Sequence, residues 1–172
     1  MQRPHDNTYW ASPGRLLAGE YPSAWNERDA GRRLHAYLDC GVTDFLDLTC
    51  RGELPPYEHL LQEIAAELGV DARYRRIPVR DMDIPDDPGV MHEILEYLDA
   101  VVAAERVAYV HCWGGIGRTG TVVGCYFVNT GMTGDAALDR VADLWMSVEK
   151  SVHYPTSPQT HEQFAYVRRW PA

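Results

Sequence analysis

Apolar residues recur at helical spacing over several stretches of the chain. A first helix is predicted from about Glu27 to Asp39, where Cys40-Gly41 ends it. Over residues 57–68 apolar side chains return every three or four positions, and Gly69 is a typical stop. A further apolar stripe covers residues 91–102. The pattern therefore predicts three helices in the first part of the chain.

Short apolar runs between these helices predict strands. VTDFLDLT (42–49) is expected to be a partly buried strand, and ARYRRIPV (72–79) a second strand. VAYVH (107–111) suits a strand that is buried on both faces. Near the start, the residues around Tyr9 and the segment RLLAGEYP (15–22) are predicted as short extended pieces.

The last part of the chain predicts more helices and completes the fold class. TGTVVGCYFV (119–128) is apolar nearly all round, which is typical of a buried central helix. Another helix is expected to begin at Ser157-Pro158. A third carries the apolar stripe Leu138, Val141, Ala142, Trp145 and Val148. Strands that alternate with helices imply right-handed crossovers, so we expect an α/β fold with a mainly parallel sheet and helices on both sides.

Length and charge limit the possible functions. With 172 residues, 45% of them hydrophobic, the chain suits a single domain over residues 1–172. The net charge of -9 argues against binding nucleic acid or an anionic membrane. MQRPHDNTYW lacks the apolar core of a signal peptide, and no window approaches the roughly 20 apolar residues that cross a bilayer. We therefore expect a soluble cytoplasmic protein, and a monomer.

The cysteines and histidines do not suggest a disulfide scaffold or a metal site. The four cysteines, Cys40, Cys50, Cys112 and Cys125, show no C-x-x-C pairing. We expect Cys40 and Cys125 to be buried, reduced thiols. The seven histidines are scattered without ligand spacing, so we expect neither a metal nor a cofactor.

The stretch VHCWGGIGRTGT (110–121) lies between a predicted buried strand and a predicted buried helix. Ligands of α/β proteins bind at the carboxyl ends of such strands. Gly114, Gly115 and Gly117 lack a Cβ, so the backbone can curl and direct several N–H groups at one point. These amides and the N-terminus of the next helix suit a phosphate. The loop lacks the G-K-[ST] of nucleotide hydrolases, so its chemistry must differ.

Cys112 and Arg118 of this loop suggest nucleophilic chemistry on a phosphate. Such surroundings lower a thiol pKa from roughly 8.5 to about 3.5–7.5, which makes Cys112 a candidate thiolate nucleophile. Arg118 provides a planar fork for two phosphate oxygens. Thr119 is expected to donate its hydroxyl toward the sulfur, and His111 to orient the loop. C-x5-R alone also fits a glycine-rich turn with a buried cysteine, but H-C-x-x-G-x-x-R-T-G after a buried strand favours a site.

A phosphocysteine route also needs a general acid, and the proline-punctuated loop RDMDIPDDPG (80–89) offers carboxylates for it. Asp81 leads, because D-x-x-x-P at 81–85 combines a mobile loop with a fixed hinge. Spacing alone leaves a solvated surface loop equally possible. The other candidates are Asp83, Asp86 and Asp87.

HCWGGIGRTG (111–120) resembles the signature of the cysteine-dependent protein tyrosine and dual-specificity phosphatases. PVRDMDIPD (78–86) is similar to their general-acid loop, and PQTHEQFAYV (158–167) to their glutamine loop. The resemblance implies that Gln159 and Gln163 position the hydrolytic water. It also implies that the phosphate is held by the loop residues Trp113, Gly114, Gly115, Ile116, Gly117 and Arg118.

Within that superfamily, LTCRGELPPY (48–57), P-x-x-D-x-x-x-P-D (78–86) and HCWGGIGR (111–118) resemble the cyclin-dependent-kinase-associated phosphatase group. This likeness gives Cys50 a second role, a reversible disulfide with Cys112 that protects the nucleophile. A merely buried Cys50 thiol remains an equal alternative.

The resemblance and the chain length together suggest a substrate. The variable loop positions 113–116 hold no lysine or histidine, which disfavours phosphoinositides. Tyrosine-specific relatives are longer, so we expect a shallower pocket for phosphotyrosine and also phosphoserine or phosphothreonine in proteins. Trp113 or Ile116 should lie near its rim, whereas Tyr57 and Trp145 should serve packing.

The sequence also leaves alternative functions to consider. A sulfurtransferase or arsenate reductase would not explain Arg118-Thr119 together with Asp81 and Gln159. A non-catalytic phosphate-binding module usually loses the cysteine, arginine or aspartate, all of which are present here. A phosphatase of a phosphoinositide or small molecule is the other alternative.

Overall fold

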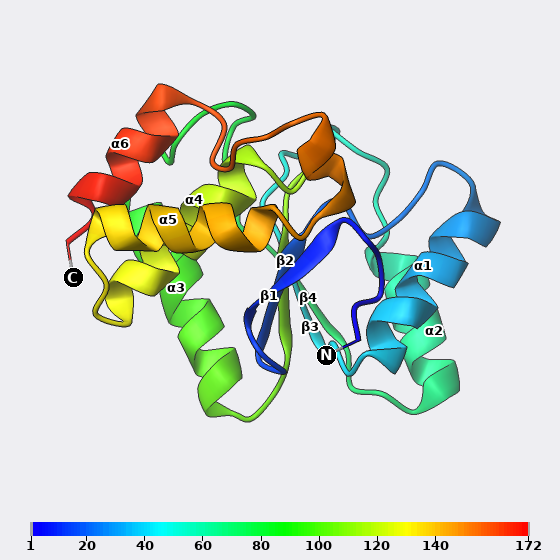
Figure 1. Ribbon diagram of the computed structural model, residues 1–172. Helices are drawn as coiled ribbons and strands as arrows, with labels where there is room; N and C mark the ends of the chain where they lie inside the picture. The colour runs from blue at the N-terminus through cyan, green and yellow to red at the C-terminus, as the bar shows by residue number, and fades with distance from the viewer. Residues whose placement is uncertain (1, 172) are drawn as a thin grey trace.

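A five-stranded sheet with helices on both faces makes up residues 2–171, which the computed structural model describes (Figure 1). The strands stand in the order β1-β2-β5-β3-β4, and only the β1–β2 pair is antiparallel. They are β1 (Thr8–Ser12), β2 (Leu16–Gly19), β3 (Asp44–Asp47), β4 (Arg73–Arg76) and β5 (Ala108–His111). The predicted α/β fold with a mainly parallel sheet is confirmed.

The helices form two layers. α1 and α2 cover one face of the sheet, and α3 to α6 lie on the other face (Figure 1). The helices are α1 (Glu27–Asp39), α2 (Glu58–Leu68), α3 (Pro88–Ala103), α4 (Gly117–Asn129), α5 (Gly134–Trp145) and α6 (His161–Arg169), with a short 3-10 helix at Glu149–Val152. Each layer has its own apolar core against the sheet. Within the described residues no helix is both long and apolar enough to span a bilayer.

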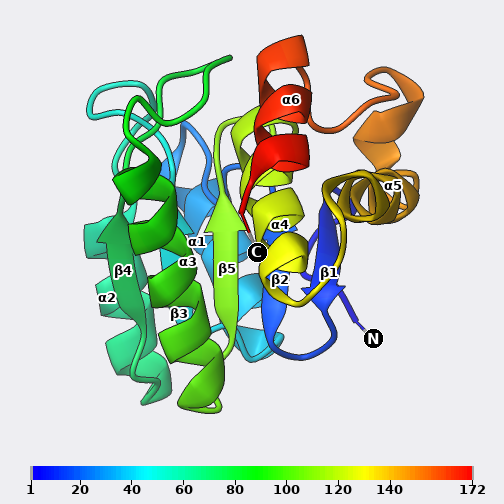
Figure 2. The same cartoon turned by 90° about the vertical axis from the view of Figure 1, so that its left-hand side faces the viewer.

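The central helix α4 is buried over nearly its whole length, as its apolar sequence predicts. In Figure 2 α6 lies over α4. The two helices approach closely at Gly124, where a Cβ would lie 2.8 Å from a methyl group of Val167. This packing fixes the N-terminus of α4 at the carboxyl end of β5.

Three local expectations were wrong. The last helix begins at His161 rather than at Ser157-Pro158, because Thr160 caps it and the Ser157 hydroxyl donates to the Ile116 carbonyl at 2.8 Å. The strand β3 is fully rather than partly buried, since it pairs with β5 and β4 in the middle of the sheet. Cys40 is only half-buried because it follows the end of α1, whereas Cys125 on α4 is buried as expected.

Candidate active site

Cys112 begins the loop that joins β5 to α4, and it lines a cavity of about 700 Å³. Other loop residues, Trp113, Gly114, Ile116 and Gly117, line the same cavity. The loop backbone passes very close to the end of β2. At Gly115, with φ of +74°, a Cβ would lie 2.4 Å from the carbonyl carbon of Gly19, so only glycine fits.

Arg118 is buried and is not among the residues that line the cavity, and it is held by a carboxylate that the sequence did not reveal. Its Nη2 and Nη1 donate to Glu53 Oε1 and Oε2 at 2.6 and 2.9 Å, and Nη1 also donates to the Val79 carbonyl at 3.1 Å. Its Nε is buried and has no hydrogen-bond partner within residues 2–171. Burial lowers the pKa of Arg118, but Glu53, Cys112 and Asp81 outweigh it, so the pKa is raised and the charge is permanent.

Glu53 lies in the loop after β3, and contacts with two residues fix its position. Besides Arg118, its Oε2 accepts the backbone N–H of Cys50 at 2.9 Å. Burial opposes ionisation, but the hydrogen bonds from Arg118 and Cys50 are stronger and the pKa of Glu53 is lowered. The only sequence signal was a charged residue just after a buried strand, which does not reveal its partner.

Asp81 is the one carboxylate of the loop 80–89 that lines the cavity. Its Oδ1 lies 2.8 Å from Arg118 Nη2, and half of its side chain is exposed. The other three have partners outside the cavity: Asp83 accepts the Ile84 N–H, Asp86 pairs with Arg80, and Asp87 caps α3 at Gly89. The structure therefore brings Asp81, and none of the other three, to the Cys112 side.

The two glutamines lie in different places. Gln159 lines the cavity. Gln163 is fully buried beside it, where its Oε1 accepts the N–H groups of Gln159 and Thr160 at 3.0 and 3.1 Å. Its Nε2 donates to the Asp83 carbonyl at 3.0 Å. The Gln163 amide thus ties the acidic loop to the start of α6, and it does not line the cavity.

His111 and Thr119 flank the cysteine loop. His111 Nδ1 donates to the Cys112 carbonyl at 3.1 Å, so Nε2 must accept from the Tyr57 hydroxyl at 2.7 Å. Burial lowers the pKa of His111, which keeps the ring neutral and suits the expected orienting role. Thr119 Oγ1 is buried without a hydrogen-bond partner in the described chain, so the expected bond to the sulfur does not form.

Cys50 lies on the Arg118 side of the site. Its Sγ is 3.8 Å from the Val79 carbonyl oxygen, which also accepts Arg118 Nη1. Cys50 and Cys112 are both free thiols here, so the reversible disulfide stays a prediction.

The cavity rim is partly as expected. Trp113 is 56% exposed on the cavity wall, and Ile116 also contributes to that wall. Tyr57 and Trp145 are buried in packing, as predicted. Sequence reasoning considered cations only within the cysteine loop and missed Arg33 and Lys150, which reach the cavity from distant segments. Among residues 2–171, no cluster of His, Cys, Asp or Glu could hold a metal ion.

The family match of this chain places it in the class of the dual-specificity and protein tyrosine phosphatases, and the arrangement of Cys112, Arg118 and Asp81 fits that class. Residues 5–164 match the family model described as PTP-SAK, the Swiss Army Knife protein DSP-PTPase phosphatase domain. The chain belongs to this family.

Known proteins and structures agree with that assignment. Human cyclin-dependent kinase inhibitor 3 is 29% identical over 108 residues, which cover 61% of this chain and 50% of that protein. The chain thus spans about half the length of the curated relatives it matches. Kinase-associated phosphatase, solved with its catalytic cysteine changed to serine, is 21% identical with a TM-score of 0.73, covering 94% of this chain and 90% of the other. PTPMT1 in complex with PI(5)P is 16% identical with a TM-score of 0.70, covering 95% and 94%.

Proposed function

We propose that this protein hydrolyses phosphotyrosine, and also phosphoserine and phosphothreonine, in proteins through a phosphocysteine intermediate on Cys112. The observation that carries the proposal is the state of Arg118. Glu53 fixes one edge of its guanidinium, and Nη2 also contacts the half-exposed loop residue Asp81. The buried Nε has no hydrogen-bond partner among residues 2–171. A buried donor without a partner needs an explanation, and a phosphate oxygen provides one.

The first step transfers the phosphoryl group. The Cys112 thiolate attacks phosphorus, the S–P bond forms, and the ester P–O bond breaks. When the phosphate displaces it from Arg118, the Asp81 carboxylate takes up a proton from solvent and then donates that proton to the leaving oxygen, while Arg118 binds the phosphate oxygens.

The second step hydrolyses the phosphocysteine and regenerates the free enzyme. The Asp81 carboxylate accepts a proton from a water that Gln159 positions, and the water oxygen attacks phosphorus. The S–P bond breaks, inorganic phosphate leaves, and Cys112 is again a thiolate. Gln163 supports this step indirectly, because its amide holds both Gln159 and the acidic loop.

Two observations bear on the substrate class. Two of the relatives, cyclin-dependent kinase inhibitor 3 and kinase-associated phosphatase, are named for kinases, which suits a protein substrate, whereas PTPMT1 was solved with PI(5)P. A non-protein substrate with several phosphates is the second candidate, because Arg33 and Lys150 line the cavity.

Hydrolysis of para-nitrophenyl phosphate and of a phosphotyrosine peptide by a small set of variants tests the proposal. Cys112→Ser should abolish turnover. Asp81→Asn should lower the rate strongly, and more for the peptide, whose leaving group is poorer. Asp83→Asn, in the same loop but paired away from the cavity, is the matched control. Retained turnover in Cys112→Ser would overturn the mechanism, and loss in Asp83→Asn with none in Asp81→Asn would overturn the choice of acid.

A further inference from the structure

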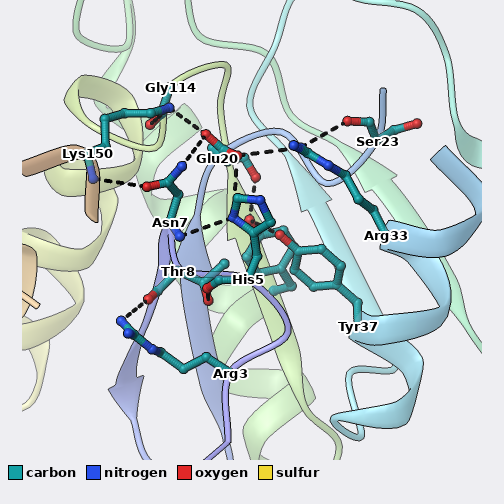
Figure 3. Close-up of polar contacts among 11 residues, drawn as sticks. Arg3, His5, Asn7, Thr8, Glu20, Ser23, Arg33, Tyr37, Gly114 and Lys150 are labelled. Carbon is teal, nitrogen blue, oxygen red and sulfur yellow. Dashed lines mark hydrogen bonds and ion pairs between the residues drawn. The ribbon is translucent and has the colours of Figure 1, made fainter. Parts of the chain in front are cut away.

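The cavity continues well beyond the end where Cys112 and Asp81 lie. A single phosphate occupies only a small part of about 700 Å³. The remaining wall carries two cations, Arg33 from α1 and Lys150 from the 3-10 helix. In Figure 3 they approach the same carboxylate, Glu20, from opposite sides. This second part of the cavity has no role in the proposed chemistry.

Glu20 holds the two cations without neutralising both. Arg33 Nη1 lies 3.4 Å from one oxygen of Glu20, and Lys150 Nζ pairs with the other. Asn7 donates to that second oxygen at 3.2 Å (Figure 3), and the Glu20 side chain is only 12% exposed. His5 also faces Glu20 at 3.5 Å, but burial lowers the pKa of His5, so it adds little charge at neutral pH. Arg33 and Lys150 therefore carry one positive charge more than Glu20 neutralises, with Asp6 near His5 as a further acidic side chain.

Both cations have capacity left for a ligand. Only Nη1 of Arg33 has partners within residues 2–171, namely Glu20 and the Ser23 carbonyl, so Nε and Nη2 are free to donate. Lys150 Nζ also donates to the Gly114 carbonyl at 3.3 Å. An anion bound here would thus lie next to the loop that takes the first phosphate.

Large exposed apolar side chains also line the cavity, which helps to identify the ligand. Of the eight large apolar side chains that are most exposed in the described chain, four line this cavity: Trp25, Met82, Trp113 and Tyr154. Exposed apolar side chains grouped at one site mark a surface that binds a protein, a membrane or another ligand with apolar groups. A free inositol polyphosphate has no apolar surface to bury there, and the net charge of -9 repels an anionic membrane.

We infer that Arg33 and Lys150 form a second anion subsite, which receives a second phosphorylated side chain of the polypeptide whose first phosphate reacts at Cys112. The inference rests on the proposed function and specifies its substrate as a doubly phosphorylated segment. Charge-assisted hydrogen bonds from a guanidinium and an ammonium group provide the selectivity.

The test compares kcat/KM for two synthetic peptides of one sequence, one with phosphotyrosine alone and one with an added phosphoserine nearby. Wild type should prefer the doubly phosphorylated peptide about tenfold, which corresponds to about 1.4 kcal/mol. Arg33→Gln should bring the ratio close to one, and Arg33→Lys should restore part of it. The preference should also fall as salt is added, because the subsite is partly exposed.

Arg32→Gln is the matched control. Arg32 lies on the same helix and pairs with Asp29, but it does not line the cavity, so the wild-type ratio should remain. A wild-type ratio near one, or an unchanged ratio in Arg33→Gln, would overturn the subsite while peptide hydrolysis upholds the proposed function. Hydrolysis of a soluble inositol polyphosphate with higher kcat/KM than either peptide would overturn the polypeptide assignment. Failure to hydrolyse any of these esters would overturn the proposed function itself.

Discussion

The carboxylates of Glu53 and Asp81 both contact Arg118, but they differ in exposure, which indicates different roles. The Glu53 side chain is 16% exposed and makes a two-pronged contact, whereas Asp81 is 50% exposed and makes a single one. An exposed loop carboxylate can leave its partner at low cost, but a partly buried, doubly bonded one cannot. In the proposed mechanism, Glu53 therefore positions Arg118 throughout, and Asp81 contacts it only until a phosphate binds.

Replacing Glu53 should misplace Arg118. Glu53→Gln removes a charged hydrogen-bond acceptor, for which about 1.5–3 kcal/mol is typical, so kcat/KM should fall roughly 10- to 100-fold. Steady-state kinetics with para-nitrophenyl phosphate measures this. Glu58→Gln, an exposed change at the start of α2, should match wild type. Equal rates for the two variants would contradict the positioning role.

At the scale of elements, two segments distant in the sequence shape the phosphate loop. The end of β2 touches Gly115, and the Tyr21 N–H beyond it donates to the Trp113 carbonyl at 2.9 Å. The turn before α6 contributes the Ser157 hydroxyl on the Ile116 carbonyl. The loop conformation therefore depends on tertiary contacts as well as on its own glycines.

Comparing Gly115→Ala with Gly41→Ala should separate two roles of glycine, which are to adopt a positive φ and to leave space where a Cβ would collide. A side chain at positive φ costs about 1–2 kcal/mol, and at Gly115 the added Cβ also collides with backbone at Gly19. Gly41→Ala is the control, with φ of +85° and no atom within 4 Å of the added Cβ. Urea unfolding and kcat/KM should show a modest loss of stability with full activity for Gly41→Ala, and loss of activity for Gly115→Ala. Equal behaviour of the two would show that crowding at Gly115 does not matter.

The sequence predicted those features that are local. Cys112 and Arg118 share one loop, and the hydrophobic spacing gave the helices and the central strands. Glu53, Arg33 and Lys150 were not predicted. Strand order and helix packing bring Glu53 to Arg118 and the other two residues to the cavity, and no sequence spacing encodes these contacts. The start of α6 was misplaced for a similar reason, since Ser157 bonds to the distant Ile116 instead of capping a helix.

At the scale of the molecule, the sheet assembles the site. Glu53 follows β3, Asp81 follows β4, and Cys112 follows β5, and these three strands are parallel neighbours. Their carboxyl ends therefore meet at one edge of the sheet. His111, the last residue of β5, sits at this edge and is held neutral between Tyr57 and the Cys112 carbonyl.

The buried neutral histidine should make stability depend on pH. Burial lowers the pKa of His111 in the folded protein. Below about pH 6.5 the unfolded chain therefore binds a proton at this residue that the folded protein does not bind. The free energy of unfolding should therefore fall as the pH drops from 6.5, by at most about 1.4 kcal/mol per pH unit for this group. Urea titrations at several pH values should show a shallower slope for His111→Gln than for wild type. The exposed control His59→Gln should keep the wild-type slope, and a slope unchanged in His111→Gln would contradict the assignment.

The central claim is that the phosphoryl group passes through Cys112, and trapping it there is the most direct measurement. In Asp81→Asn, para-nitrophenyl phosphate has a good leaving group, so the first step proceeds, but the second step lacks its base. Acid quenching during turnover, followed by peptide mass spectrometry, should find one phosphoryl group on the Cys112 peptide, and none when Cys112→Ser is added. Turnover without phosphorylated Cys112, or phosphate on another residue, would contradict the account.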